Sequence, residues 1–268
     1  MQCFIVAAFS DTPFHGNPAG VCVLDAALPP ATMQAIAAEL RQPETAFVLR
    51  TGDDWAIRWF SPVVEVALCG HATLAAACVL WNALGVEQHV LHFASASGPL
   101  AAERDPDGTI WLDFPATAGT PGAVPAELAA CIDIGWVAAA RHDDRWLLEC
   151  ADAAAVRAAR PDFARLARTG IRSLILTARS DRPGHDIVSR NFAPIVGVDE
   201  DQVTGAAHAC LAPHWHGRLG PDLTCWQASA RGGTVRTRLR GDRVALGGRA
   251  VIEFAGAMPA IAMPTAPA

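Results

Sequence analysis

The chain has 268 residues, of which 51% are hydrophobic and 18% are charged, and its formal net charge at pH 7 is −6. This length suits one large domain or two small ones, and the composition excludes disorder as the main state. The acidic balance argues against a nucleic-acid partner. All 21 basic residues are arginine and tyrosine is absent, which excludes lysine Schiff bases and phenolic acids from the chemistry.

The first part of the chain alternates predicted strands and helices. Residues 3–9, 20–24 and 46–50 have the apolar pattern of strands, whereas residues 32–41 place apolar side chains at helical spacing. Residues 72–84 carry no charged side chain. A helix that is apolar all round belongs in the interior of a structure, so this segment predicts a central helix.

The second part is predicted from shorter signals. Residues 126–130 and 151–169 indicate helices, and residues 174–177 indicate a strand. The glycines and proline of residues 119–124 predict a linker. Residues 235–240 alternate apolar and arginine side chains before Gly241-Asp242, which predicts a strand with a solvated arginine face that ends in a turn.

The eight cysteines and the N-terminus bear on the compartment. No two cysteines form a Cys-x-x-Cys motif, so neither a zinc ribbon nor a thioredoxin motif is predicted. We expect mostly buried, unpaired thiols in a reducing cytoplasm. The sequence shows neither a basic signal-peptide start nor an apolar run that could span a bilayer, so no membrane association is expected.

An internal sequence repeat divides the chain. Residues 57–81 and 189–215 both contain Arg-x-Phe-[Ser/Ala]-Pro, followed by a glycine and an alanine-rich apolar segment. The two glycines, Gly70 and Gly205, lie 135 residues apart, about half the chain. A repeat of this length predicts two similar halves, residues 1–118 and 119–268, rather than a solenoid.

Each copy of the repeat predicts a helix that begins at a glycine. The first N–H groups of a helix have no intrahelical acceptor and carry partial positive charge. Gly70 and Gly205 would let a ligand approach these groups closely, so the two helix starts predict a site for a carboxylate-bearing metabolite. The alternative is that each glycine only permits a tight strand-to-helix turn.

A few side chains near these helix starts can exchange protons. Glu44 lies at a helix-to-strand junction beside apolar residues, where burial would raise its pKa. His71 and Cys69 flank Gly70, and Asp201 precedes Gly205 by four residues. Each also has a purely structural interpretation, as a helix cap, a core histidine, a loop carboxylate or an inert buried thiol.

The sequence contains no motif that would indicate a metal or cofactor site. His208, His214 and His216 cluster in the sequence, but Pro213 interrupts the helical register and His-Glu-x-x-His is absent, so we interpret them as structural. The glycine-rich dinucleotide fingerprint and the serine-hydrolase elbow are absent as well.

Short motifs in a fixed order resemble a known family. They are Phe14-x-Gly16-Asn17-Pro18, Glu44-Thr45-Ala46-Phe47-Val48, Phe60-Ser61-Pro62, Cys69-Gly70-His71-Ala72-Thr73, Phe192-Ala193-Pro194 and Glu200-Asp201-Gln202-Val203-Thr204-Gly205-Ala206-Ala207-His208. This ordered set resembles the PhzF-like phenazine-biosynthesis protein family. The resemblance implies the diaminopimelate-epimerase-like α/β (α+β) fold, with two pseudo-symmetric halves, each a curved sheet around a central helix, and an active site between them.

The resemblance also implies an activity. In this family a dihydro-hydroxyanthranilate is isomerised by proton transfer, with no metal and no organic cofactor. Matched by motif, Glu44 is the general acid/base, with His71 and Asp201 as the other catalytic residues. The matched substrate-binding positions are Asn17, Cys69, Gly70, Ala72, Thr204, Gly205 and Ala206. Dimers are frequent in the family, so a homodimer is expected.

Two departures from the family pattern concern the substrate. Gln202 stands in place of the family's proline, and Ala206 in place of a serine that contacts the substrate. Cys69 resembles one of the two catalytic thiols of related epimerases, but Thr204 stands where the second would be. The alternatives to a Glu44 isomerase are therefore an epimerase or hydro-lyase of a small amino or hydroxy acid that uses Cys69, and a non-catalytic small-molecule binding module.

Overall fold

The structure, a computed structural model, describes residues 1–259 of the chain, which form 18 strands, six α-helices and one 3₁₀ helix. These residues form two units, Met1–Leu112 together with the residues from Arg249 onward, and Asp113–Gly248. We call them unit 1 and unit 2. Strand β18 (Ala250–Ala257) therefore belongs to unit 1, whereas the sequence repeat had assigned residues 119–268 to the second half.

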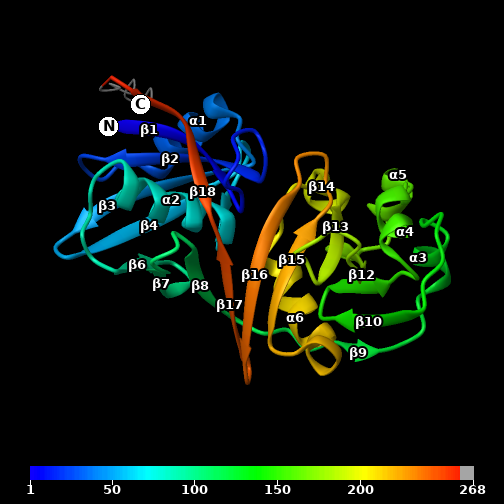
Figure 1. Cartoon of the computed structure of the whole chain (residues 1–268). Helices are drawn as coiled ribbons and strands as arrows, with labels where there is room; N and C mark the ends of the chain where they lie inside the picture. The colour runs from blue at the N-terminus through cyan, green and yellow to red at the C-terminus, as the bar shows by residue number, and fades with distance from the viewer. Residues whose placement is uncertain (260–268) are drawn as a thin grey trace. The chain divides into compact units, whose positions relative to one another are not determined.

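Unit 1 is a strongly curved sheet (Figure 1). Strand β1 pairs antiparallel with β2 and β18, β2 pairs parallel with β3, and β3 pairs antiparallel with β4. Besides β18, its strands are β1 (Gln2–Ala8), β2 (Asn17–Leu24), β3 (Glu44–Thr51), β4 (Asp54–Phe60), β5 (Glu65–Val66), β6 (Val90–Ser95), β7 (Gly98–Arg104) and the first residues of β8 (Ile110–Pro115).

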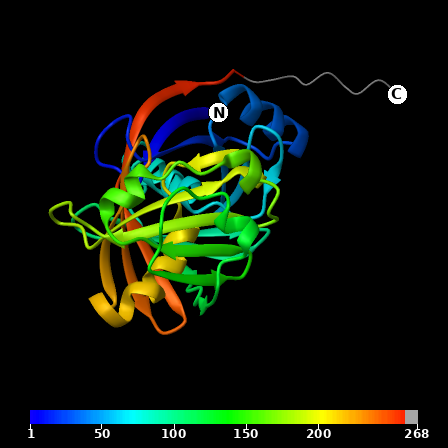
Figure 2. The same cartoon turned by 90° about the vertical axis from the view of Figure 1, so that its right-hand side faces the viewer.

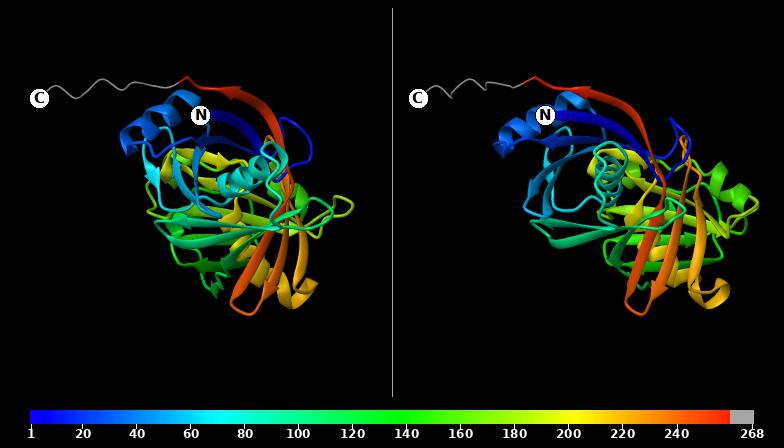
Figure 3. Two further views of the ribbon diagram at one scale, coloured as in Figure 1. Left: turned by 90° about the vertical axis from the view of Figure 1, so that its left-hand side faces the viewer. Right: turned by 60° about the vertical axis from the view of Figure 1, so that its left-hand side comes forward.

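Helix α2 (Gly70–Asn82) lies inside this sheet, as the right-hand view of Figure 3 shows. It contacts β1, β2, β3, β7 and β18, and every residue from His71 to Trp81 is buried. The charge-free sequence explains this placement, because no side chain of the helix needs to reach water. The predicted central helix is confirmed, but it ends at Asn82, and residues 82–84 are exposed although they carry no charge. Helix α1 (Pro30–Leu40) covers the other face of the sheet, where Met33 and Ile36 pack with Phe47 and Phe60.

Unit 2 repeats this plan around helix α6 (Gly205–Leu219), as seen in Figure 2. Cys210, Leu211 and Trp215 of α6 share one core cluster with Leu147 and Ile175 from the sheet. The strands of the unit are β9 (Thr120–Pro121), β10 (Ala138–His142), β11 (Arg145–Glu149), β12 (Ser173–Arg179), β13 (Ile187–Ala193), β14 (Val198–Asp201), β15 (Asp222–Gln227), β16 (Gly233–Arg240), β17 (Arg243–Gly248) and the last residues of β8.

Two of the predicted segments in unit 2 were wrong in detail. The linker predicted at residues 119–124 contains β9, which pairs with β10. The helix predicted at residues 151–169 is two short helices, α4 (Ala153–Ala158) and α5 (Phe163–Leu166), because Pro161 lies between them and cannot continue a helix. The remaining helical elements are α3 (Ala126–Ala129) and the 3₁₀ turn η1 (Pro194–Val196).

The internal sequence repeat has a structural counterpart in the strand pairing. In unit 1, β2 and β3 are parallel and β3 and β4 are antiparallel, with Thr45 opposite Phe60. In unit 2, β11 and β12 are parallel and β12 and β13 are antiparallel, with Leu174 opposite Phe192. The two Arg-x-Phe-x-Pro motifs thus end equivalent strands. By the same register, the position of Glu44 in unit 1 corresponds to Ser173 in unit 2.

Helix α6 continues through Pro213, contrary to the expected interruption. A proline inside a helix removes the N–H that would bond the carbonyl four residues earlier. Here the carbonyl of Ala209 accepts a hydrogen bond of 3.0 Å from the backbone N–H of Thr117 instead. The helix keeps its length because a neighbouring segment replaces the missing donor.

All eight cysteines are free and buried, as expected. Cys3 and Cys22 face each other across β1 and β2, with their sulfur atoms 3.2 Å apart. Among residues 1–259, no helix has the length and apolar character needed to cross a membrane.

Candidate functional site

Three predicted site residues of unit 1 lie together at the start of helix α2. Glu44 is the first residue of β3, Cys69 is the N-cap of α2, and His71 is in its first turn. The Nε2 atom of His71 lies 3.4 Å from Oε2 of Glu44, and its Nδ1 atom lies 3.4 Å from Sγ of Cys69. The imidazole therefore stands between a carboxylate and a thiol.

Burial differs within this group. His71 is 8% exposed and Cys69 is buried, whereas the side chain of Glu44 is 26% exposed. The carboxylate is thus the member of the group that a small molecule can reach most directly. Ala46 and Phe47, which follow Glu44 in β3, are buried, in agreement with the expected apolar setting of the strand.

His71 is neutral at physiological pH. Burial lowers its pKa to about 4, and a hydrogen bond to the backbone of Pro18 opposes this only in part. The Nε2 atom has no hydrogen-bond partner, so its 3.4 Å contact with Glu44 is not a hydrogen bond. A neutral imidazole offers one N–H donor and one lone pair, which suits it to orient a substrate rather than to neutralise a carboxylate.

The other predicted residues of unit 1 line the same region of the fold. Asn17 begins β2 and is fully buried, opposite Ala8 of β1. Gly16 before it has φ +68°, and a Cβ there would lie 2.1 Å from the carbonyl oxygen of Ala8, so the turn requires glycine. Gly70 and the buried Ala72 belong to the first turn of α2, whose N–H groups lack intrahelical acceptors.

Unit 2 has its own group at the start of helix α6. Thr204 is the N-cap, but its Oγ1 donates a 2.7 Å hydrogen bond to Oδ2 of Asp201 instead of capping the helix. Gln227, which is fully buried on β15, accepts from the N–H of Thr204 at 2.8 Å and donates to the carbonyl of Asp201 at 2.7 Å. Gln227 therefore holds the turn that carries both predicted residues, while Gly205 and Ala206 open the helix.

The two helix starts match position by position. Cys69 and Thr204 are both extended N-caps without a side-chain capping bond. Four residues on, Thr73 Oγ1 donates to the carbonyl of Cys69 at 2.7 Å, and His208 Nδ1 donates to that of Thr204 at 2.8 Å. Different residue types thus fill one structural role, so the sequence alone does not indicate that Thr73 and His208 are equivalent. Gln227 was missed because no motif contains it.

An arginine–glutamate pair holds the segment before each helix. In unit 1, Arg58 makes two hydrogen bonds of 2.7 and 2.8 Å to Glu65, and in unit 2 Arg190 makes the same pair of contacts to Glu200. Arg190 is 8% exposed and also donates to the carbonyl of Ala159 at 2.8 Å. Bidentate pairs of this kind fix direction as well as distance.

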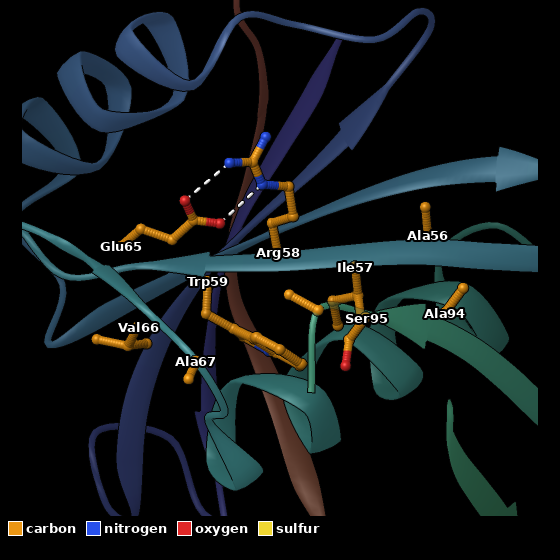
Figure 4. A pocket seen from close by; sticks show the side chains of 10 residues that line it. Ala56, Ile57, Arg58, Trp59, Glu65, Val66, Ala67, Ala94 and Ser95 are labelled. Carbon is orange, nitrogen blue, oxygen red and sulfur yellow. Dashed lines mark hydrogen bonds and ion pairs between the residues drawn. The ribbon is translucent and has the colours of Figure 1, made fainter. Parts of the chain in front are cut away.

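Figure 4 shows the Arg58–Glu65 pair beside a pocket lined by residues of β4. The pocket has a volume of about 680 Å³. Arg58 and Glu65 lie on one side of the strand, and Ile57 and Trp59 lie on the other. The lining is mostly apolar, and neither Glu44, Cys69 nor His71 contributes to it. This cavity therefore does not belong to the group at the start of α2.

Two of the three clustered histidines of unit 2, His208 and His214, have structural partners, whereas His216 is exposed. His208 is fully buried, and burial lowers its pKa to about 4. His214 contacts Oε2 of Glu149 at 2.8 Å, and Arg218 makes two bonds of 2.7 Å to the same carboxylate. This arrangement ties α6 to β11 and supports the structural interpretation of these side chains.

Comparisons with known proteins agree with these features. The sequence model of a family described as "Phenazine biosynthesis-like protein" matches residues 6–256. An uncharacterized isomerase of Pseudomonas aeruginosa is 49% identical over 252 residues, which cover 94% of this chain and 95% of that protein.

Solved structures give the same result for the fold. The crystal structure of a PhzF-family phenazine biosynthesis protein from Enterococcus faecalis has a TM-score of 0.91 at 39% identity, covering 95% of this chain and 97% of that one. A predicted epimerase from Pseudomonas aeruginosa has a TM-score of 0.73 at 22% identity, covering 97% and 99%, which shows a shared fold alone. The predicted fold class is confirmed.

Proposed function

The chain belongs to the family of phenazine biosynthesis-like proteins, and we propose that it is an isomerase in which Glu44 moves a proton on a small substrate that bears a carboxylate. The relatives named as isomerases support the isomerase type of reaction. The observation that carries the proposal is the placement of the partly exposed Glu44 carboxylate against a buried, neutral imidazole.

The proposed step begins with a carbon–hydrogen bond made acidic by conjugation. The Glu44 carboxylate accepts the proton, the electron pair delocalises into the conjugated system, and the Glu44 carboxylic acid returns the proton to a different carbon. Atoms and charge balance within the substrate, so the step requires neither metal nor organic cofactor. Charge that develops on the substrate is stabilised by the N–H groups of the first turn of α2.

We assign the neighbouring residues supporting roles. His71 orients a polar group of the substrate through its N–H or its lone pair. Because the ring is neutral, it places no positive charge beside Glu44 that would make the carboxylate a weaker base. In unit 2, Asp201 is held by Thr204 and by Gln227, and we propose that it binds an amino or hydroxyl group of the substrate. Ala206 has no hydroxyl, so its side chain can contact a substrate only through its methyl group.

The test is solvent deuterium incorporation. The chain is incubated in D₂O with a dihydro-hydroxyanthranilate and with a panel of small amino and hydroxy carboxylates, and exchange is followed by NMR and mass spectrometry. Glu44→Gln is expected to abolish exchange, because an amide cannot accept the proton. Glu39→Gln is the matched control, since Glu39 is exposed on α1 and should behave as the unmodified chain. Full exchange in Glu44→Gln would refute the proposal.

One contact supports the second candidate, an epimerase or hydro-lyase that uses a thiol. Sγ of Cys69 lies 3.4 Å from Nδ1 of His71, close enough to pass its proton to this nitrogen in the tautomer that leaves the Nδ1 lone pair free. The counterpart of Cys69 is Thr204, a poor base, and its hydroxyl is already bonded to Asp201. The variant Cys69→Ala separates the candidates: exchange persists if Glu44 is the base and disappears if the thiol is.

A further inference from the structure

Glu44, Cys69 and His71 offer three donor atoms, one from each side chain, that all lie within 4.8 Å of one another. Within residues 1–259 this is the one group of three such side chains close enough to share an ion. We propose that this group binds a Zn²⁺ ion and that the bound ion inhibits the enzyme. Binding follows from the geometry by itself, whereas inhibition rests on the function proposed above.

The donor types favour zinc over the common hard cations. A thiolate, an imidazole and a carboxylate are the three protein ligands of Zn²⁺, whereas Mg²⁺ and Ca²⁺ prefer oxygen atoms throughout. Cys69 and His71 are two residues apart at the start of one helix, and Glu44 comes from a neighbouring strand. Because both elements belong to unit 1, the three donors are fixed by one folded unit.

The spacing suits a tetrahedral ion. With Zn–S near 2.3 Å and Zn–N near 2.0 Å, the sulfur and nitrogen ligands of a tetrahedral site are separated by about 3.5 Å. Sγ of Cys69 and Nδ1 of His71 are 3.4 Å apart. The carboxylate must then move by roughly 1 Å to complete the site, and Glu44 is the most exposed member of the group. Three protein ligands leave a fourth position for water or a substrate carboxylate.

The ligands must give up their protons to the ion. His71 binds in the tautomer whose Nδ1 carries the lone pair, because a nitrogen that binds zinc cannot keep its proton. Cys69 binds as a thiolate, and its proton is released to the buffer. Once an oxygen of Glu44 is a zinc ligand, its lone pair can no longer accept a proton from carbon. The reaction should therefore stop while the ion is bound and resume when a chelator removes it.

The experiment measures binding without substrate. The full chain is freed of metal with a chelator, and Zn²⁺ is titrated against a chromogenic chelator, expecting one ion per chain. Removing a direct ligand should cost more than the 10–100-fold typical of an indirect one. Cys69→Ala and His71→Gln are therefore each expected to weaken binding by more than about 100-fold. Cys78→Ala is the matched control, because Cys78 lies on the same helix but outside the group, and its affinity should not change.

Cobalt supplies a measurement that does not depend on the variants being folded. Co²⁺ in the unmodified chain should give a thiolate charge-transfer band that Zn²⁺ displaces. Absence of this band, or unchanged zinc affinity in Cys69→Ala, overturns the zinc site. Zinc binding in a chain that shows no deuterium exchange with any tested substrate would leave the site intact and count against the isomerase. Exchange that continues at full rate with the ion bound would refute the inhibition.

Discussion

His208 makes the stability of the chain depend on pH in a way that can be measured. The side chain is fully buried in α6, its Nδ1 donates to the carbonyl of Thr204, and its Nε2 has no partner. Burial lowers its pKa from 6.5 to about 4. The unfolded chain therefore binds a proton at this ring more readily than the folded chain does, so acid favours unfolding.

The size and pH range of the effect follow from these two values. The stabilisation is complete above about pH 6.5, declines as the pH falls, and is lost near pH 4. The whole difference corresponds to roughly 3 kcal/mol, of which roughly 2 kcal/mol is lost by pH 5. His71 adds a similar dependence, because burial also lowers its pKa to about 4, but this contribution is common to every protein compared.

The substitution to test is His208→Thr. Thr73 occupies the matching position in α2, where its hydroxyl satisfies the carbonyl of the N-cap, so threonine can replace the hydrogen bond of His208 without a titratable ring. His208→Gln is the second variant and better preserves volume. Denaturant unfolding at pH 7 and pH 5 is expected to show that both variants lose roughly 2 kcal/mol less than the unmodified chain. An equal loss in all three proteins would refute the assignment.

Three further outcomes are expected. Arg190→Met leaves the partly buried carboxylate of Glu200 without its partner and should lower the free energy of unfolding by about 2–3 kcal/mol. Arg58→Met, at a site more than a third exposed, should cost about 1 kcal/mol or less, and denaturant unfolding distinguishes the two variants. Gln227→Met should lower kcat for deuterium exchange while the melting temperature changes little, because it releases the turn that carries Asp201. Gln227→Glu should restore part of kcat, because it keeps the acceptor for the backbone N–H of Thr204. A loss of kcat that only accompanies a large fall in melting temperature would argue for a purely structural role. Gly16→Ala should destabilise the chain by well over about 1 kcal/mol because its Cβ meets a backbone carbonyl, while Gly85→Ala, at a similar positive φ but with open space, should show a smaller thermal shift.

Residue patterns alone are sufficient to predict the central helices and their starts. A helical segment that is apolar on every side is stable in an interior, and the charge-free residues from Ala72 onward therefore predict α2. The repeated Arg-x-Phe-x-Pro motif also predicts two equivalent strand ends, because two copies of one motif favour the same local structure. The motif order was sufficient to indicate the family, since Glu44, His71 and Asp201 occupy matching positions.

Helix boundaries and linkers were determined less well because they depend on pairing partners. Residues 120–121 carry a linker signal but form a strand, since β10 offers hydrogen bonds to their backbone. Pro213 carries a helix-breaking signal but lies within α6, since Thr117 supplies a donor from a distant part of the chain. A local signal cannot include a hydrogen bond whose partner is remote in sequence.

The environment of each site residue depends on contacts that form only in the folded chain. The sequence placed Glu44 beside apolar neighbours, but the imidazole 3.4 Å from its carboxylate belongs to a residue 27 positions later. The neutrality of His71 and the hold of Gln227 on Asp201 depend on burial and on contacts between elements. Residue types determine which proton transfers and which ligands are chemically available, whereas distance and water exclusion, which exist only after folding, determine which of them take place.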